Sequence, residues 1–451
     1  MPVVTDLERL SRRELLALVY EQQRITSLEQ EVQRLTERLH PPKRPPVRLA
    51  RLLHRLKRPG QKPGHPGMTR ATPTHLDRVV EQRLTRCPQC RGSLGPSVAV
   101  TTHVQEDLIP ARVEVTGFKR HRYYCARCRQ VVTAPPAPEE IPQSRLGPQV
   151  LTHALLLKYV HGLPFNKIRT AFQPFATLTV SEGALAQALQ RLARWLHVET
   201  AALQQAIRTS PATHVDETGW TWTGVHHWLW TFVTKRLASY RIDKSRGAGV
   251  PKDGLGEAYQ GVVVRDFHRA YTRLKGPQQK CGVHLLRELR DCAKTELSEE
   301  YRAAHRRLRR IFLDARRLVR QRSTLPPRPA ARRRPHLETR LFAWGATPYR
   351  HKTLRRLAGR ILKHHPQLLT CLKVPGVPMD NKQAERAIRP HVVIRHRSYQ
   401  SRSPTGMATH ASLMSLVHTL TLQGRAIGET LQSASLRHRH GDSTPVVVSG
   451  S

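Results

Sequence analysis

The sequence predicts a multidomain α+β protein. Three observations support this fold class: a heptad repeat near the N-terminus, two Cys-x-x-Cys pairs, and a series of apolar strands followed by a long basic helical region. With 451 residues the chain is longer than one ordinary domain, so several modules are expected.

The net charge narrows the classes of function. Lys and Arg number 76 against 33 Asp and Glu, a formal net charge of +43. A surface this basic repels itself unless it binds an anion, and a phosphate backbone is the obvious partner. A genome rich in Arg codons explains part of the excess, but the charge is clustered along the chain. No apolar run reaches the roughly 18 residues of a membrane span, and the start lacks a signal-peptide pattern. We therefore expect a cytoplasmic, nucleoid-associated protein without membrane contact.

Residues 1–40 are predicted to form a coiled-coil helix. Apolar residues recur every seven positions, with two further Leu between them: Leu18, Ile25, Val32 and Leu39, then Leu28 and Leu35. An amphipathic helix packed on its own chain fits the same pattern. Residues 41–80 are predicted to be a flexible basic linker, because 41–70 contain nine Lys or Arg, seven Pro and no acidic residue. Such an arm either contacts DNA phosphates or remains a solvated linker.

Residues 81–135 are predicted to be a zinc ribbon. Two pairs, Cys87 with Cys90 and Cys125 with Cys128, are joined by segments that alternate as β-strands do. Four thiolates close a tetrahedral zinc site and stabilise a module too small to have its own core. Zinc in such a site is structural, since no open position remains for chemistry. The alternative is four free thiols in a reducing compartment.

Residues 145–205 follow a Pro-rich break and are predicted to be helical. We expect one helix over Leu151–Tyr159, a second that starts at Leu163-Pro164, and a third that is opened by a capping box at 179–182 and runs to Leu196. Two short helices and a capped one resemble a helix-turn-helix unit, although an ordinary helical connector fits nearly as well.

Residues 210–433 are predicted to form one α/β domain. Strands are expected at 213–220, 226–234, 238–243 and 261–266, with a helix near 254–260 and a further short apolar strand at 280–286 before a long helical region. Three strands in a meander, a helix, a further strand that ends in Asp, then a strand and a helix follow the order of a ribonuclease H-like core.

A basic insertion is predicted within this domain, at about 295–375. It should be mostly helical, with a Pro-rich interruption at LPPRPAARRRP, residues 325–335. From Arg302 to Lys363 the chain has twenty Lys or Arg against two acidic residues, which indicates phosphate contact or, alternatively, a solvated charged face. Residues 434–451 are expected to be a disordered tail.

Three acidic residues stand where a metal site would need them. Asp216 lies in the first predicted strand, Asp266 ends the strand GVVVRD, and Glu385 lies early in an apparent helix. Phosphodiester cleavage needs an oxygen nucleophile and a stabilised leaving oxygen, and two metal ions about 4 Å apart supply both. Magnesium prefers oxygen ligands, so carboxylates from separate elements must converge. Taken singly, each acid also fits a turn, a cap or a surface ion pair, and Glu217 competes with Asp216.

Four blocks of sequence resemble the catalytic blocks of transposases of the bacterial Insertion Sequence 66 family. They are HVDET at 214–218, VVRDFHRAY at 263–271, CGVHLLREL at 281–289 and DNKQAERAIRP at 380–390. The heptad N-terminus, GQKPGHPG at 60–67, the Cys pairs and the helix-turn-helix-like segment follow the family's order, so the resemblance covers nearly the whole chain.

The resemblance implies a DDE-type transposase with a ribonuclease H-like catalytic domain that cleaves and joins the ends of an insertion sequence. The family's catalytic triad falls on Asp216, Asp266 and Glu385, which would hold two Mg²⁺ ions, with Mn²⁺ as an alternative. The family's Cys-x-x-His-x-x-Arg block falls on Cys281, His284 and Arg287. His284 would orient a phosphate or bind a carboxylate, unless it is an ordinary core histidine.

Further contacts and partners follow from the same resemblance. Arg386 and Arg389 follow Glu385 on one helix and, with Arg287, are candidate DNA contacts. The coiled coil would pair subunits into a homodimer or higher assembly, and a role for accessory transposition proteins stays open. Two departures from the family, Lys382 after Asn381 in place of a second Asn, and Phe267 after Asp266 where many members have Gly, replace no predicted metal ligand.

Three other functions fit parts of the pattern. A DNA-binding regulator that keeps the fold without catalysis shares every basic and zinc feature. A structural RNA-binding protein fits the charge, but aromatic residues are only 5% of the chain and no aromatic RNA-recognition motif is present. A nuclease of the same fold would cleave without joining.

Overall fold

The computed structural model describes most of the chain from residue 112 onward and shorter pieces before it. The described residues are 11, 21–29, 31, 75–84, 86, 88–93, 95–97, 99, 100, 104, 112–141, 144–292, 298–321, 327–398 and 401–448. The chain divides into two compact units, Met1–Asp107 and Leu108–Ser451. Residues 21–29 of the first unit are helical, but most of the predicted coiled coil and of the basic linker lies outside the described residues.

The second unit begins with a β-hairpin. Strands β1 (Arg122–Cys125) and β2 (Gln130–Thr133) pair antiparallel, with Cys125 opposite Gln130. The turn between them contains Cys128 and closes at Arg129, whose φ of 53° lies in the left-handed region. The second Cys-x-x-Cys pair therefore spans a tight turn, as a zinc knuckle requires.

Four helical segments precede the sheet. They are α3 (Pro148–Leu155), which continues as the π-helical η2 (Leu156–Val160), α4 (Phe165–Ala176), α5 (Glu182–Trp195) and α6 (His197–Arg208). The predicted capping box is wrong in detail, because the Ser181 side chain, not that of Thr179, accepts the N–H of Ala184. The Thr179 hydroxyl instead donates to the Gln173 side chain across the preceding loop.

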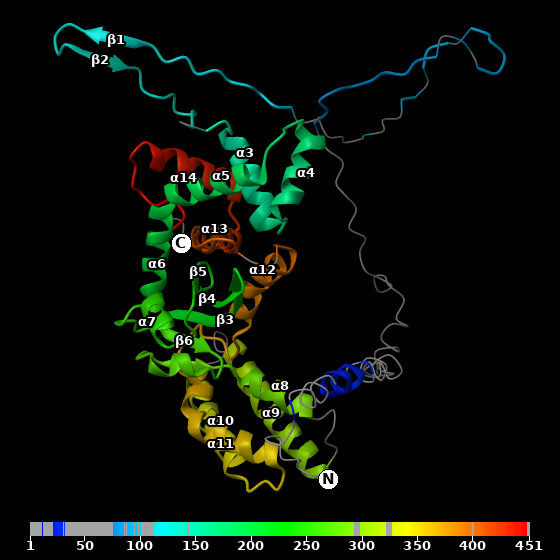
Figure 1. Cartoon of the computed structure of the whole chain (residues 1–451). Coiled ribbons are helices and arrows are strands. Elements are labelled where there is room, and N and C mark those ends of the chain that lie inside the picture. Colours follow the sequence, from blue (N-terminus) through cyan, green and yellow to red (C-terminus); the bar gives the residue numbers. More distant parts are fainter. Residues whose placement is uncertain are drawn as a thin grey trace. The chain divides into compact units, whose positions relative to one another are not determined.

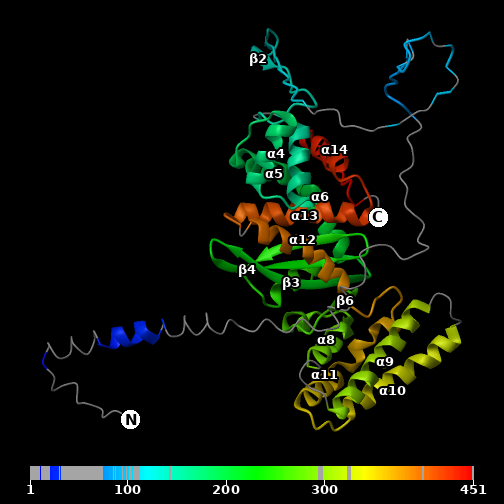
Figure 2. The same ribbon diagram turned by 90° about the vertical axis from the view of Figure 1, so that its right-hand side faces the viewer.

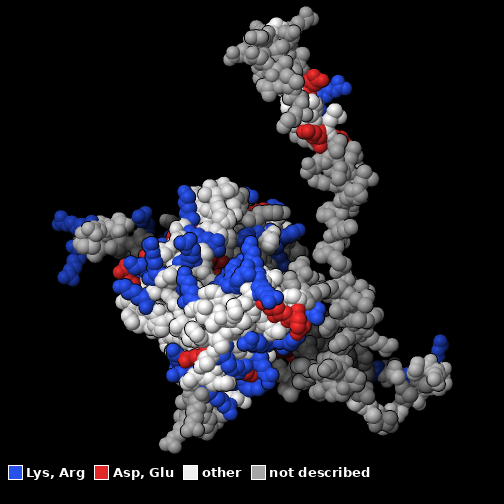
Figure 3. All heavy atoms as spheres, turned by 90° about the horizontal axis from the view of Figure 1, so that it is seen from below, with Lys and Arg blue, Asp and Glu red and all other residues white. Residues whose placement is uncertain are grey.

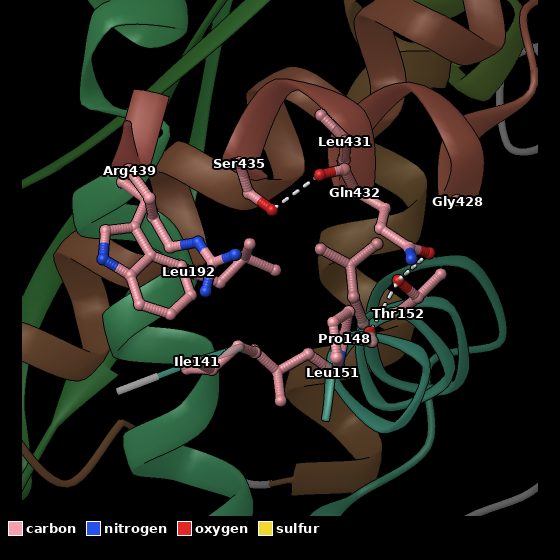
Figure 4. Close-up of a pocket in the computed structure, with 12 residues that line it drawn as sticks. Ile141, Pro148, Leu151, Thr152, Leu192, Gly428, Leu431, Gln432, Ser435 and Arg439 are labelled. Atoms are coloured by element: carbon pink, nitrogen blue, oxygen red, sulfur yellow. Dashed lines mark hydrogen bonds between the residues drawn. The ribbon is translucent and has the colours of Figure 1, made fainter. Parts of the chain in front are cut away.

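Helices α3 and α5 pack against α14 (Ile427–Arg439) near the end of the chain. Figure 4 shows the centre of this packing, where a gap of only about 10 Å³ remains. Thr152 of α3 donates to the Gln432 side chain of α14 at 3.2 Å, and the Arg439 guanidinium lies 5.2 Å from the Trp195 ring. The N-terminal helices are thus joined to the C-terminal helix in one layer (Figure 1).

A five-stranded mixed sheet forms the centre of the second unit, in the order β5-β4-β3-β6-β7. Its strands are β3 (Ala212–Trp222), β4 (Val225–Val233), β5 (Ala238–Asp243), β6 (Val262–Arg265) and β7 (Gln278–Lys280). The first three form an antiparallel meander, whereas β6 and β7 run parallel to β3. Thr223 and Gly224 join β3 to β4 with φ of 43° and 80°, the mirror-image turn that the twist of a hairpin favours.

Two sequence predictions in this region differ from the structure. The helix expected near 254–260 is α7 (Gly249–Leu255), which ends earlier because Gly256 adopts a φ of 85°. The apolar piece at 280–286 is mostly helix rather than strand, since β7 ends at Lys280 and α8 begins at Gly282 and runs to Cys292. Its apolar residues face the core at helical spacing, which a short run cannot distinguish from a strand.

Helices α12 (Lys382–Ser398) and α13 (Pro404–Gln423) cover the meander (Figure 2). Helix α13 lies on the edge strand β5, where the Thr419 and Ser415 hydroxyls accept the N–H groups of Ala238 and Tyr240, both at 2.9 Å. These backbone N–H groups on the outer side of β5 therefore have hydrogen-bond acceptors, and helix α13 protects this edge of the sheet from pairing with another strand.

The predicted basic insertion contains three helices, α9 (Glu299–Gln321), α10 (Pro327–Ala346) and α11 (Lys352–Leu368), followed by the short η4 (Thr370–Leu372). They have a second apolar core, which includes Leu308, Phe312, Leu341, Trp344 and Leu357. The Pro-rich stretch at 325–335 is not the expected interruption, because α10 starts at Pro327, where Pro is tolerated, and runs through Pro335.

The predicted disordered tail is also wrong. Residues 434–439 belong to α14, and the chain after it packs onto α6. The fully buried Glu199 carboxylate accepts the N–H groups of Val446 and Val447 at 2.8 Å and lies 2.9 Å from Nε2 of His438. Among the helices that the structure describes, none has both the length and the apolar character to cross a membrane.

Candidate active site

The register of the sheet places two of the predicted acids side by side. Strand β3 pairs in parallel with β6, with His214 opposite Val264. Asp216 and Asp266 each lie two residues further along their chains. Because adjacent strands are about 4.8 Å apart, the two carboxyl groups emerge at neighbouring points of the sheet.

The third acid, Glu385, comes from the first turn of α12. The start of this helix is tied to β3 by Asn381, whose side chain is fully buried. Its amide nitrogen donates to the carbonyl of Val215 at 2.8 Å, and its amide oxygen lies 3.1 Å from Nδ1 of His214. The backbone N–H of Asn381 also points to the sulfur of Cys281, at 3.3 Å. These contacts tie α12 to the residue immediately before Asp216 and to the start of α8.

Three neighbouring carboxyl groups affect the ionisation of Asp216. Burial first, and then the charges of Asp266, Glu217 and Glu385, raise the pKa of Asp216 to about 8, against one hydrogen bond from the N–H of Glu217. Four carboxyl groups therefore interact across a small, partly dry region. A divalent cation bound there would relieve their repulsion.

The chemistry of these donors fits magnesium, which binds carboxylate oxygens. Within the described part of the chain, no three His, Cys, Asp or Glu side chains are already grouped closely enough to hold a metal ion. The fit therefore rests on donor type and on uncompensated charge, and binding would require the three carboxylates to turn toward one point.

Helix α8 brings two of the other predicted site residues to Glu385. Nε2 of His284 lies 3.7 Å from the Glu385 carboxylate, and the Arg287 guanidinium lies 3.4 Å from both of its oxygens. The His284 contact is too long for a hydrogen bond. Arg386 and Arg389 are exposed on α12 and contact none of the three acids through a hydrogen bond or ion pair in the described structure.

Glu217, the competitor of Asp216 in the sequence, is occupied by other partners. Its side chain is 2% exposed and contacts the Arg246 guanidinium at 2.9 Å, Nδ1 of His268 at 3.4 Å and the Tyr271 hydroxyl. Arg246 in turn lies 4.1 Å from the centre of the Trp228 ring. Among the described residues, Asp216 has no ion pair with a cationic side chain, so its carboxyl group is less engaged than that of Glu217.

Sequence reasoning missed Arg265, which holds the loop of Asp266. Its guanidinium is buried, donates to the side-chain oxygen of Gln278 at 2.8 and 2.5 Å, and donates to the carbonyls of Asp266 and His268 at 3.2 Å. Burial lowers the pKa of Arg265 to about 10, opposed by the charge of Asp266. An arginine at the end of an apolar strand is ordinarily predicted to be exposed to solvent, so nothing in the sequence indicated that Arg265 is buried and holds this loop.

The predicted zinc ligands are described only in part. Cys125 and Cys128 lie on the β1–β2 hairpin, Cys90 is exposed in the first unit, and Cys87 falls outside the described residues. The pKa of the Cys125 thiol is lowered by hydrogen bonds from the backbone and side chain of Cys128 and from the N–H of Arg127. These hydrogen bonds favour the thiolate, which is the form that binds zinc.

Two family models and a relative match this sequence. The family model of the zinc-finger binding domain of IS66 transposases matches residues 85–129, which include all four predicted zinc ligands. An uncharacterised protein of Sinorhizobium fredii, y4qI, is 22% identical over 392 residues, which cover 78% of this chain and 70% of the relative. The family model of the IS66 transposases matches residues 143–409, which include the sheet, the inserted helices and all three acids. Because this match covers more than half of the sequence, the chain belongs to the IS66 family of transposases.

Proposed function

We propose that this protein cleaves and joins DNA by a DDE two-metal mechanism, with Asp216, Asp266 and Glu385 as the ligands of two Mg²⁺ ions. The proposal rests first on the pairing of β3 with β6, which brings Asp216 next to Asp266. It rests also on the contact of Asn381 with Val215, which holds the start of α12, and with it Glu385, against β3. The sheet order β5-β4-β3-β6-β7, with a meander followed by two parallel strands, supports a ribonuclease H-like core. Membership of a transposase family supports strand transfer as the overall reaction.

Each residue of the site would have a definite task. Two Mg²⁺ ions, when bound, would supply the Lewis acidity that strand cleavage and the attack of the freed 3′-hydroxyl on target DNA require. Asp216 and Asp266 hold their carboxylates at adjacent strands, and Glu385 brings the third from α12. Arg287 and His284 orient the Glu385 carboxylate, and Arg265 holds the loop that carries Asp266.

The remaining modules would bind and pair the DNA ends. The zinc finger and the helices α3–α6, as a helix-turn-helix-like unit, would dock the ends of the element, and Arg386 and Arg389 would contact backbone phosphates near Glu385. The basic linker and inserted helices would neutralise further phosphates. The N-terminal heptad segment would pair two subunits, so that both ends are held in one complex.

The variant Asp216→Asn tests the assignment. It keeps the size of the side chain but removes one ionised ligand, so cleavage of a plasmid that carries the element's ends should fall at least about a thousandfold in Mg²⁺. DNA binding without Mg²⁺ should be unchanged. Asp243→Asn, at the far end of β5 in an exposed ion pair with Arg241, is the matched control and should cleave normally. Strand transfer by Asp216→Asn at the wild-type rate would refute the assignment.

The same assay distinguishes the rival functions. A regulator that has lost catalysis would not cleave in any divalent metal. A nuclease would cleave but would not join a supplied 3′-hydroxyl end to a target plasmid.

A further inference from the structure

One buried cation beside Asp266 has no role in the mechanism above. Lys280 is the last residue of β7 and is 2% exposed. Its ammonium makes no hydrogen bond or ion pair with a residue that the structure describes, and Nζ is not one of the buried side-chain atoms without a partner. The stem is therefore buried while the ammonium still reaches solvent, and a lysine so enclosed is rare unless an anion compensates it.

Phe267, which directly follows Asp266, gathers three basic side chains around one ring. The ammonium of Lys280 lies 5.1 Å from the ring centre, and the Arg360 guanidinium carbon lies 5.3 Å from it. The His364 ring is tilted against the same ring at 5.7 Å. Arg360 and His364 belong to α11, so the inserted helix contributes to the surroundings of Asp266. Cations held against an aromatic face are oriented without losing their charge.

Positive charge predominates in this group. Arg360 is paired with Glu288 at 2.8 Å, but Glu288 is shared with Arg356. Lys363, exposed on α11, has no ion pair in the described structure.

The pKa values reflect this imbalance. Burial lowers the pKa of Lys280 to about 8, as do the charges of Arg265, Lys363 and Arg360, whereas only Asp266 opposes them. Burial, the charge of Lys280 and the same three cations lower the pKa of His364 to about 4, so its ring is neutral at neutral pH. The group therefore needs an anion, and Asp266 alone does not balance it.

We propose that Lys280 and Arg360, which lie against Phe267, together with the neighbouring Lys363, bind a backbone phosphate of the DNA substrate next to the phosphate that is cleaved. This inference rests on the proposed function, because that function brings a polyanion to Asp266. The inserted helices then complete the active site through α11, in addition to any general attraction of DNA. Figure 3 shows that Lys and Arg are widespread on the face of the molecule seen from below, so a DNA backbone would meet favourable charge on approach.

A double-mutant cycle tests this site by binding alone. The probe is a duplex with the element's terminal sequence, and its phosphates near the cleavage point are replaced one at a time by neutral methylphosphonates. Binding is measured by fluorescence anisotropy without divalent cations. In the wild type, one replacement should weaken binding about tenfold, and in Lys280→Gln the same replacement should have almost no effect. The slope of log K against log salt should fall by about 0.9 in Lys280→Gln.

Two further variants keep the test decisive. If Lys280→Gln does not fold, as judged by circular dichroism, the double variant Arg360→Gln/Lys363→Gln on the surface of α11 is used instead. In it, too, the methylphosphonate replacement should have almost no effect on binding. Lys352→Gln is the matched control, because it removes an exposed charge from the start of the same helix. It should keep the full methylphosphonate effect.

The outcomes separate this inference from the proposed function. A full methylphosphonate effect in both Lys280→Gln and the double variant would overturn the phosphate site and leave Lys280 as a counter-charge for Asp266. Cleavage by Asp216→Asn is scored separately and bears only on the metal ligands. The site would be supported if the methylphosphonate replacement no longer weakens binding in either variant but still weakens it in Lys352→Gln.

Discussion

Asn381→Ala is the variant through which the link between α12 and the sheet is best examined. The substitution removes both polar atoms of a fully buried side chain. Burial lowers the pKa of His214 to about 4, so its ring is neutral at neutral pH. Since the amide nitrogen of Asn381 donates to Val215, its oxygen faces His214 and the proton must be on Nδ1 of the ring.

The expected cost follows from the two groups that lose their partners. The Val215 carbonyl and the His214 N–H would remain buried without a hydrogen bond, and each such group costs about 1–3 kcal/mol. The free energy of unfolding should therefore fall by about 2–6 kcal/mol. Because α12 would no longer be fixed against β3, Glu385 would shift relative to Asp216. A displacement near 1 Å typically costs about a hundredfold in rate.

Two measurements check this prediction. Urea unfolding gives the change in stability, and DNA cleavage below the unfolding temperature gives the change in rate, with DNA binding measured in parallel. A merely structural role would lower stability but leave the rate of the folded protein unchanged. Asn166→Ala is the control, because its side chain is exposed and accepts only the N–H of Lys167 in the first turn of α4; it should lower stability by no more than about 1 kcal/mol. An Asn381→Ala protein as stable and active as the control would show that this reasoning is wrong.

Three other predictions concern the rest of the chain. Arg265→Met should lower cleavage activity with little change in DNA affinity, because the carbonyls of Asp266 and His268 lose their donor; equal loss of affinity and rate would contradict a role in holding the loop. Cys125→Ser should reduce the zinc content measured by plasma mass spectrometry, whereas Cys371→Ala, in the second apolar core, should not; unchanged zinc in Cys125→Ser would remove it from the ligand set. Stability should fall on acidification, because burial lowers the pKa of His410 to about 3 and that of His418 to about 4, below the value of about 6.5 in an unfolded chain. The unfolded state then binds protons first, so this contribution is complete above pH 6.5 and falls by about 2 kcal/mol for each ring by pH 5. The loss of stability is measured as the fall in the thermal unfolding midpoint between pH 7.5 and 5.0. The Asp216→Asn variant is used, since the raised pKa of Asp216 would change stability in the opposite direction. Equal midpoints at the two pH values would refute this prediction.

The local sequence pattern was sufficient to predict those elements whose structure depends mainly on residues close together in the chain. The alternation and apolar runs predicted β3, β4, β5 and β6 within a few residues, because a strand buried on a face needs apolar side chains along its length. The paired Cys-x-x-Cys motifs predicted the zinc finger that the family comparison confirms. The pattern failed at 280–286 and at the helix caps, where a short run suits either type of element and the surrounding chain decides.

The family, the zinc finger and strands β3 to β6 could be predicted from residue type and spacing, which also gave three candidate metal ligands. The fold alone shows that Glu217 contacts Arg246 and Tyr271, and that α11 comes back to Lys280 and Phe267. It also decided that the C-terminal residues pack on Glu199 instead of remaining free. Such contacts join residues far apart in the chain, and the burial and charge of each partner come from the folded surroundings, which neither composition nor spacing contains.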